Sequence, residues 1–470
     1  MKKNTAYLLL FFVIFSSCSR EEWLDIKPKG VIIPSRVNDY RLLMDQVDLF
    51  GQGAADKISP GFGVSYSNSD YMSDDFVIRD EIMNRFGQTT INKFTWQDNI
   101  YDENAEDADW VQLYGQIYTT NLVIEEVMEA SGGTMAQKLQ ILAEAKIQRA
   151  FSYYALVNMY ALHYTPGNAF DIPGVPLRLD SSLGDIDLSR VSVGEIYQFM
   201  LEEVESSIDD LPEIPEANNL KHRPTKVSAY AFLARLHLYM GNYEACLQAA
   251  NQSLSIYNTV NDYNTHGTVF DVLSIPYPQD DNQLLWYKES NDTFALLVAS
   301  DDLYNLYEEG DIRRILYSPI SFLFGIPADG YALGYQYFIN YRNLGCTVPE
   351  VLLMRAESSA RLGDTAQAIQ DLNTLRINRF NTESYEAITS TDTGEILALV
   401  KDERRRELSG SGLRFFDLKR YNAFDNANIT LTRNLDGQTY TLLANSNNWA
   451  IPIAQKYILQ SPQIGENIRD

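Results

Sequence analysis

The chain has 470 residues and a formal net charge of −25, with 63 acidic against 38 basic side chains. This acidic balance argues against a nucleic-acid-binding protein, because phosphate backbones are held by Lys and Arg. Hydrophobic residues make up 45% of the chain, which excludes a disordered protein and is enough for a large core.

The first 17 residues predict a targeting segment that is not part of the fold. Lys2 and Lys3 precede an apolar run over 7–15, which is too short to span a bilayer. The order Phe-Ser-Ser-Cys then ends at Cys18 and resembles a bacterial lipobox, in which Cys18 would carry the lipid anchor. Secretion with cleavage elsewhere is the alternative. We interpret residues 18–30 as a polar tether and 31–470 as a single domain.

A short helix is expected over 37–50, followed by an irregular segment over about 51–106. This segment is rich in Gly, Ser, Asn and Asp, a composition typical of loops. It also carries aromatic residues such as Tyr66, Tyr71 and Trp96. Aromatic rings in a loop are candidates for ligand contacts, although each of them is equally compatible with a place in the core.

From Trp110 onward, apolar residues recur at helical spacing. Segments 241–247 and 363–369 each begin with Gly after a helix, and the small residues Cys246 and Ala368 stand at equivalent places in them. This repeat is typical of a tetratricopeptide-like helix pair. The sequence predicts an all-α scaffold of about four such pairs, over about 107–162, 192–258, 348–380 and 395–421.

The segment over about 259–347 interrupts the helical pattern. It alternates Tyr, Pro, Gly and Asp with short apolar runs, which predicts loops and a few short strands. Trp286, Tyr287, Tyr331 and Tyr335 lie in this segment. Together with 51–106 it forms the large irregular part in which we expect the ligand-binding residues.

Residues 401–420, KDERRRELSGSGLRFFDLKR, predict two helices separated by a Ser-Gly-Ser-Gly break. Gly410 and Gly412 suit this break because glycine adopts positive φ at little cost. We interpret the dense charges, including Arg404–Arg406, Arg414 and Arg420, as structural, since Arg-carboxylate pairs stabilise helix contacts.

The order of residues in 401–420 resembles the C-terminal motif of the SusD/RagB family, and residues 348–380 resemble a second motif of that family. The resemblance implies a surface-facing, lipid-anchored protein of the Bacteroidetes outer membrane. Such a protein would bind oligosaccharide or polysaccharide and deliver it to a SusC-like TonB-dependent transporter, acting as the lid of that barrel. Neither a cofactor nor catalysis on the ligand is implied.

The sequence contains no GxSxG nucleophile motif, no P-loop and no dinucleotide-binding motif, and its four histidines have no metal-binding spacing. We therefore predict no catalytic and no metal site. Acidic residues over 98–107 carry oxygen ligands suited to Ca²⁺, but they lack an EF-hand spacing and fit a helix N-terminus better.

Ligand binding remains as the best-supported activity, because an aromatic ring can stack on the apolar face of a sugar while polar neighbours bind its hydroxyls. The candidate residues are Tyr66, Tyr71, Trp96, Asp98, Asn99, Trp286, Tyr287, Tyr331 and Tyr335. Among them, Trp286 lies in an apolar run and is the residue that we most expect to be buried. A peptide-binding member of the same family and a lipid-anchored glycan hydrolase are the alternatives.

Overall fold

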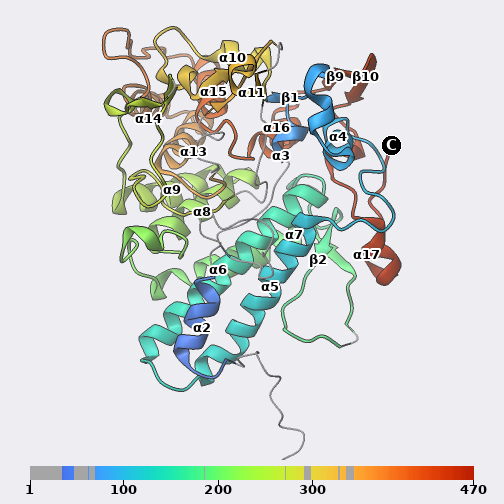
Figure 1. The fold of residues 1–470 in the computed structure, drawn as a ribbon. Coiled ribbons are helices and arrows are strands. Elements are labelled where there is room, and N and C mark those ends of the chain that lie inside the picture. The colour runs from blue at the N-terminus through green and yellow to red at the C-terminus, as the bar shows by residue number, and fades with distance from the viewer. Residues whose placement is uncertain are drawn as a thin grey trace, which may run out of the picture.

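The computed structural model confirms an all-α scaffold joined to a loop-rich part that contains short strands (Figure 1). The structure describes residues 34–46, 62, 69–184, 186–269, 271–289, 298–325, 329–334 and 343–470.

The scaffold is made by the longer helices of the chain. They are α5 (Ala108–Glu126), α6 (Met135–Tyr160), α7 (Val193–Glu205), α8 (Lys226–Tyr239), α9 (Tyr243–Ile256), α13 (Val348–Arg361), α14 (Thr365–Arg376), α15 (Thr393–Glu407) and α16 (Arg414–Asp425). The first three predicted ranges contain their helices, three of them in the second range, while α15 begins two residues before and α16 ends four residues after 395–421.

Two reversals in the scaffold are equivalent, as the repeat in the sequence predicts. Gly241 separates α8 from α9 with φ of 74°, and Gly363 separates α13 from α14 with φ of 87°. Glycine is favoured at both places because an L side chain is strained at positive φ. Cys246 and Ala368, which stand at equivalent places after these glycines, are both fully buried.

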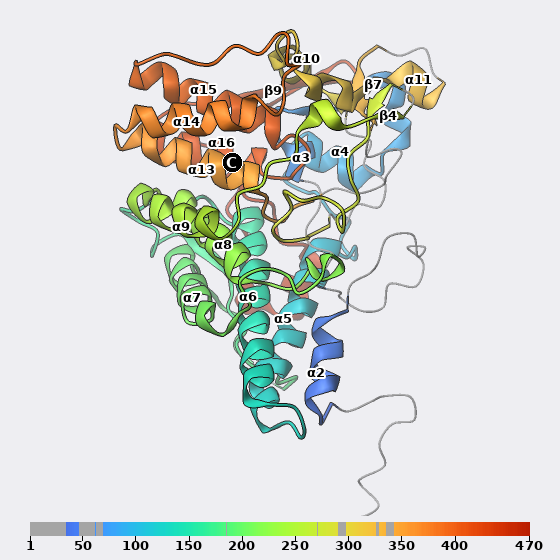
Figure 2. The same ribbon diagram turned by 90° about the vertical axis from the view of Figure 1, so that its left-hand side faces the viewer.

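The helix stack continues across the irregular segment that interrupts it in the sequence. Helix α9 packs against α13, although the whole segment over 259–347 lies between them in the chain (Figure 2). Helix α13 also packs against α15. The two copies of the repeat are therefore neighbours in space.

The two irregular segments meet in one antiparallel sheet of order β1-β6-β8-β7. Its strands are β1 (Phe76–Val77), β6 (Val298–Ala299), β7 (Tyr317–Pro319) and β8 (Tyr331–Leu333). The short helices of this part are α3 (Ser69–Met72), α4 (Gln88–Phe94), α10 (Asp301–Leu306) and α11 (Ile320–Phe324). The sheet thus holds the early segment of the chain beside the later one.

A two-stranded hairpin follows the last helix pair, and the sequence analysis did not predict it. It joins β9 (Leu431–Leu435) to β10 (Gln438–Leu442) through Asp436 and Gly437, whose φ angles are 49° and 70°. Two consecutive residues with positive φ match the tight hairpin turn for which Asp-Gly is a preferred sequence.

Smaller elements complete the chain. They are α2 (Val37–Met44), β2 (Pro173–Pro176), β3 (Arg190–Ser192), β4 (Thr268–Val269), β5 (Val272–Leu273) and α17 (Gln455–Gln460). Helix α2 covers the first part of the predicted 37–50 and ends at Asp45, and residues 47–50 lie outside the described part of the chain.

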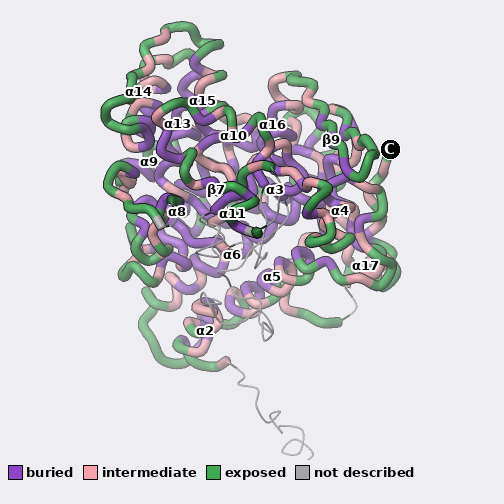
Figure 3. The backbone as a smooth tube through the Cα atoms, turned by 45° about the horizontal axis from the view of Figure 1, so that its top comes forward, coloured by how far each residue is buried: buried purple, intermediate pink, exposed green. Residues whose placement is uncertain are grey.

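The main core lies between the scaffold helices and is rich in tyrosine (Figure 3). Tyr153, Tyr154, Tyr160 and Tyr239 are fully buried there. Both described cysteines are buried free thiols. Many of the tyrosines in the sequence therefore serve packing and not ligand binding.

Candidate functional site

Trp286 is part of the core, as its apolar surroundings in the sequence predict. Its side chain is fully buried, and its indole nitrogen donates to the carbonyl of His222 at 3.0 Å. Phe151 and Phe232 pack edge-on against its ring. The neighbouring Tyr287 is also buried, and its hydroxyl donates to Glu289 at 2.7 Å. Neither ring offers a face to a ligand in this structure.

Trp96 and Tyr71 are buried as well, each with about 4% of its surface exposed. The indole nitrogen of Trp96 donates to the carbonyl of Met72 at 3.1 Å, and the backbone of Trp96 has φ of 52°. Asp98 and Asn99, which follow it, are exposed. Asp98 accepts a hydrogen bond from Asn448 at 3.0 Å. Of these four candidates, only the two polar ones reach solvent.

Arg433, on strand β9, explains why Trp96 is enclosed. Its guanidinium lies 3.8 Å from the ring centroid of Phe94 and 4.4 Å from that of Trp96. The same group donates to the backbone carbonyls of Tyr71, Ser73 and Phe94. The C-terminal hairpin thus holds two separate stretches of the irregular part together.

The charged motif over 401–420 is structural, as expected, and it too holds the early irregular segment. Arg414 binds the Asp74 carboxylate with two hydrogen bonds, at 2.7 and 2.8 Å. Arg405 donates to Asp75 at 2.7 Å. Both aspartates follow helix α3 directly, so the motif fixes α3 and the start of the sheet to the scaffold.

Tyr331 is the described candidate aromatic that remains open to solvent, with 36% of its surface exposed. Its ring stacks on that of Tyr304 from α10, with centroids 3.9 Å apart and planes 6° apart. The guanidinium of Arg314 lies 5.0 Å from the centroid of Tyr304. We call these three residues, with the two polar neighbours described next, the tyrosine platform.

Arg79 and Asp301 provide polar groups beside the platform. Arg79 Nη2 lies 3.2 Å from Asp301 Oδ1, and Gly330 packs so closely against the Arg79 guanidinium that a Cβ there would lie 2.8 Å from Nε. Arg79 Nε is buried and has no hydrogen-bond partner among the described residues. The Asp301 side chain is 83% exposed, so the ion pair itself is open to a ligand.

The sequence analysis missed Tyr304, Arg314, Arg79 and Arg433. Each acts through contacts between segments that are distant in the chain, and its neighbours in sequence give no pattern that marks it. Tyr66, Tyr335 and Cys18, together with the predicted signal peptide and tether, lie outside the described residues.

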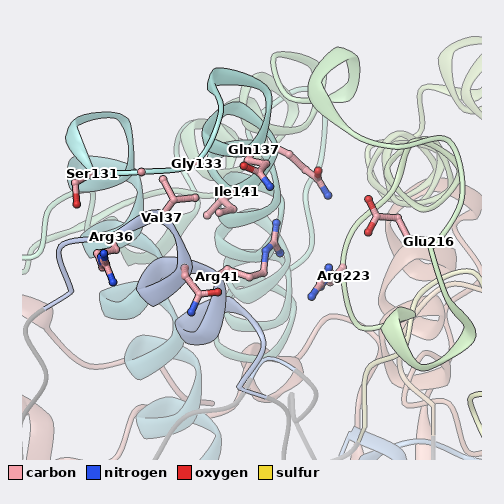
Figure 4. A pocket seen from close by; sticks show the side chains of 12 residues that line it. Arg36, Val37, Arg41, Ser131, Gly133, Gln137, Ile141, Glu216 and Arg223 are labelled. Atoms are coloured by element: carbon pink, nitrogen blue, oxygen red, sulfur yellow. The ribbon is translucent and has the colours of Figure 1, made fainter.

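A hollow of about 510 Å³ lies between α2, the N-terminal end of α6 and residues 216–223 (Figure 4), at the end of the molecule opposite to α10 (Figure 1). Two of its three lining arginines pair with acids. Arg41 contacts Glu144 at 2.5 Å, and Arg223 binds both oxygens of Asp45, at 2.7 and 2.6 Å. Its described lining contains no aromatic ring, so it lacks the stacking surface that the tyrosine platform has.

The acidic run before α5 caps that helix. Asp107 accepts a hydrogen bond from the backbone of Asp109 at 3.1 Å and another from the hydroxyl of Tyr160 at 2.5 Å. Within the described ranges, no group of three or more His, Cys, Asp or Glu residues is arranged to hold a metal ion. None of the described helices has both the length and the apolar character needed to cross a bilayer.

Comparison with known proteins gives a consistent family match. Residues 22–238 match a SusD-like family model described as "Starch-binding associating with outer membrane", and residues 348–467 match the SusD family model. A SusD-like protein of Formosa agariphila is 22% identical, over 88% of this chain and 89% of that protein.

Two solved structures share the fold over nearly their whole length. A SusD superfamily protein of Bacteroides thetaiotaomicron gives a TM-score of 0.72 at 19% identity, covering 92% of this chain and all of that one. A laminarin-binding SusD-like protein gives a TM-score of 0.63 at 18% identity, covering 93% of this chain and 99% of that one.

Proposed function

We propose a ligand-capturing function for this chain, which belongs to the SusD/RagB family. In this proposal it is a surface-exposed outer-membrane lipoprotein, anchored through Cys18, that binds oligosaccharide or polysaccharide. It delivers this ligand to a SusC-like TonB-dependent transporter and acts as the lid of that barrel. The laminarin-binding relative supports carbohydrate as the ligand class.

The tyrosine platform is the observation that carries the proposal. Tyr331 is backed by Tyr304 on one face, so its position is fixed before a ligand arrives. A fixed ring loses little conformational freedom on binding, which favours affinity. The apolar face of a sugar ring stacks on Tyr331, while Arg79 and Asp301 bind its hydroxyl groups.

No bond of the ligand is broken in this mechanism. The platform captures the ligand, and the helical scaffold presents a broad surface to the barrel. Asp98 and Asn99 remain candidates for further polar contacts because both are exposed. The transfer step is then a movement of the loaded lid over the mouth of the transporter.

The first test measures binding of laminarin, starch and xylan by isothermal titration calorimetry. We expect Tyr331→Ala to lower the affinity for the bound glycan about tenfold or more, the loss typical of a well-packed aromatic contact. Tyr331→Phe keeps the ring and most of the affinity. Tyr277→Ala removes a tyrosine that is 48% exposed outside the platform and serves as the control.

The same preparation separates the alternatives. Binding of a peptide mixture in place of all glycans would change the ligand class, and release of shorter sugars from a polysaccharide would favour the hydrolase. Purification from the native outer membrane in mild detergent tests the transporter: a large barrel protein is expected to co-purify, and its consistent absence would contradict the lid.

A further inference from the structure

A second, smaller hollow lies beside helix α5, against the loop that follows strand β2. Its volume is about 230 Å³. This part of the molecule belongs to the scaffold and not to the sheet that carries the tyrosine platform. Pockets that enclose a whole drug-sized ligand measure roughly 300–1,000 Å³, so this one suits a single ring.

One wall of the hollow is aromatic. Trp110, Tyr114 and Tyr118 recur every four residues along α5 and therefore lie on one face of the helix. Trp110 is buried and stacks on Tyr457, with centroids 5.8 Å apart, and it supports the Tyr114 ring at 4.7 Å. Tyr118 is 40% exposed. The rings of Trp110 and Tyr114 are thus packed against other side chains, and the ring of Tyr118 is exposed to solvent.

The opposite wall is polar and preformed. The side-chain amide of Asn121 donates to the carbonyls of Arg178 and Asp180, at 3.2 and 2.8 Å, which ties the loop to α5. Arg178 Nη2 donates to the carbonyl of Ser182 at 2.8 Å. The loop conformation is therefore fixed by its own hydrogen bonds and by the helix.

This wall also has an unused acceptor. Asp180 Oδ1 accepts from Arg178 at 3.1 Å and from the backbone of Ser182 at 2.9 Å. Asp180 Oδ2 accepts no hydrogen bond from the described part of the chain, and the side chain is 54% exposed. A carboxylate oxygen in this setting is a ready partner for a hydroxyl group.

We propose that this hollow binds one pyranose ring, as a second carbohydrate site separate from the tyrosine platform. The ring would place its apolar face on Tyr118 and direct its hydroxyl groups toward Asp180, Arg178 and Ser182. An apolar side chain would leave the polar wall without partners, and a small anion would leave the aromatic wall without contacts. The choice of a sugar as occupant rests on the proposed function.

A second site changes how a polymer is held. A polysaccharide that contacts both places dissociates only when both contacts open, so its overall affinity exceeds that of either site alone. A single sugar unit gains nothing from the second site. The two sites therefore favour long chains over the short products of their degradation.

Saturation-transfer NMR tests the inference with the methyl glycosides of glucose, galactose, mannose and xylose. The platform is first disabled by Tyr331→Ala, so that the remaining signal reports the hollow. We expect at least one sugar to give a signal with this variant and to lose it when Tyr118→Ala is added. Tyr118→Phe keeps the ring and should restore the signal. Val111→Ala, an exposed position on the same helix, should leave it unchanged.

Two outcomes overturn the inference: no sugar of the panel binds the Tyr331→Ala protein, or binding survives Tyr118→Ala. If Tyr331→Ala alone abolishes all glycan binding, the proposed function stands and the second site does not. If the native chain binds no polysaccharide yet a monosaccharide signal depends on Tyr118, the platform fails and the hollow remains.

Discussion

The Arg420 cluster of the scaffold and the tyrosine platform of the sheet region use arginine and tyrosine in opposite ways. In the scaffold, Arg420 is fully buried between Glu357 and Asp417, and Tyr239 is enclosed beside them. In the sheet region, an exposed Arg314 lies over a half-buried Tyr304, which in turn supports the open ring of Tyr331. The same two residue types hold the fold together in the Arg420 cluster and meet solvent in the platform.

The residues that make the family recognisable therefore differ from the residues that we propose to bind the ligand. The charged motif over 401–420 is recognisable because buried pairs tolerate few replacements. Exposed rings have no such constraint from packing, and a motif search does not find them. The comparison predicts that substitutions in the two regions affect stability and binding separately.

The largest expected effect is on stability, from Arg420→Ala. This change removes the guanidinium that contacts Glu357 at 2.5 Å and leaves buried carboxylates with too little compensation. We expect the free energy of unfolding to fall by about 3–5 kcal/mol. Urea unfolding measures it, with Lys456→Ala as the control. Lys456 pairs with an exposed Glu106, and its loss should cost about 0–1 kcal/mol. Equal losses would contradict the comparison.

We expect a smaller loss of stability when the pH is lowered. Burial alone would raise the pKa of Glu357, but the Arg420 guanidinium outweighs it and holds that pKa below the ordinary value of 4.5. Arg313 does the same for Glu403. Each depressed carboxyl contributes stability that is fully present above pH 4.5 and is lost as the pH falls through the folded pKa.

Thermal unfolding between pH 3 and 7 tests whether stability falls as the pH is lowered. The melting temperature should fall steadily below about pH 4.5, and Glu357→Gln should make the decline shallower because one titrating group is gone. A native protein that becomes more stable on acidification, or a variant with an unchanged slope, would show that these pairs do not control the acid response.

The smallest effect on stability is expected from Tyr331→Ala. This ring is partly exposed and packs mainly on one neighbour, so its loss should cost about 1 kcal/mol. Tyr239→Ala is the matched change in the scaffold and should cost about 3–5 kcal/mol, because its side chain is fully buried. If both variants lose the same stability, the platform belongs to the core and is not a surface for ligand.

Much of the scaffold follows from local sequence. The helical spacing from Trp110 onward and the glycines that end helices act over a few residues, so they predict helices and reversals without knowledge of the fold. Gly410 and Gly412 illustrate this, since both adopt positive φ between α15 and α16. The hairpin at 431–442 could also have been predicted from the sequence, because Asp436-Gly437 between residues of alternating hydrophobicity is typical of a hairpin turn.

The candidate site follows far less from the sequence. Whether an aromatic ring is buried depends on which distant segment covers it, and Trp96 is covered by Arg433 from the other end of the chain. Tyr331 differs from Trp96 because its supporting ring leaves one side open. No local pattern distinguishes the two residues, so the sequence predicts both as candidate ligand contacts.

The contacts between Arg433 and residues 71–96 affect the order in which the protein can fold during synthesis. A chain that leaves the ribosome or a translocation pore with its N-terminus first presents residues 71–96 long before strand β9 is available. Until then, the carbonyls of Tyr71, Ser73 and Phe94 lack the guanidinium that binds them in the finished protein. These hydrogen bonds form only after the C-terminal hairpin has been synthesised, so the last part of the chain completes the packing of the first.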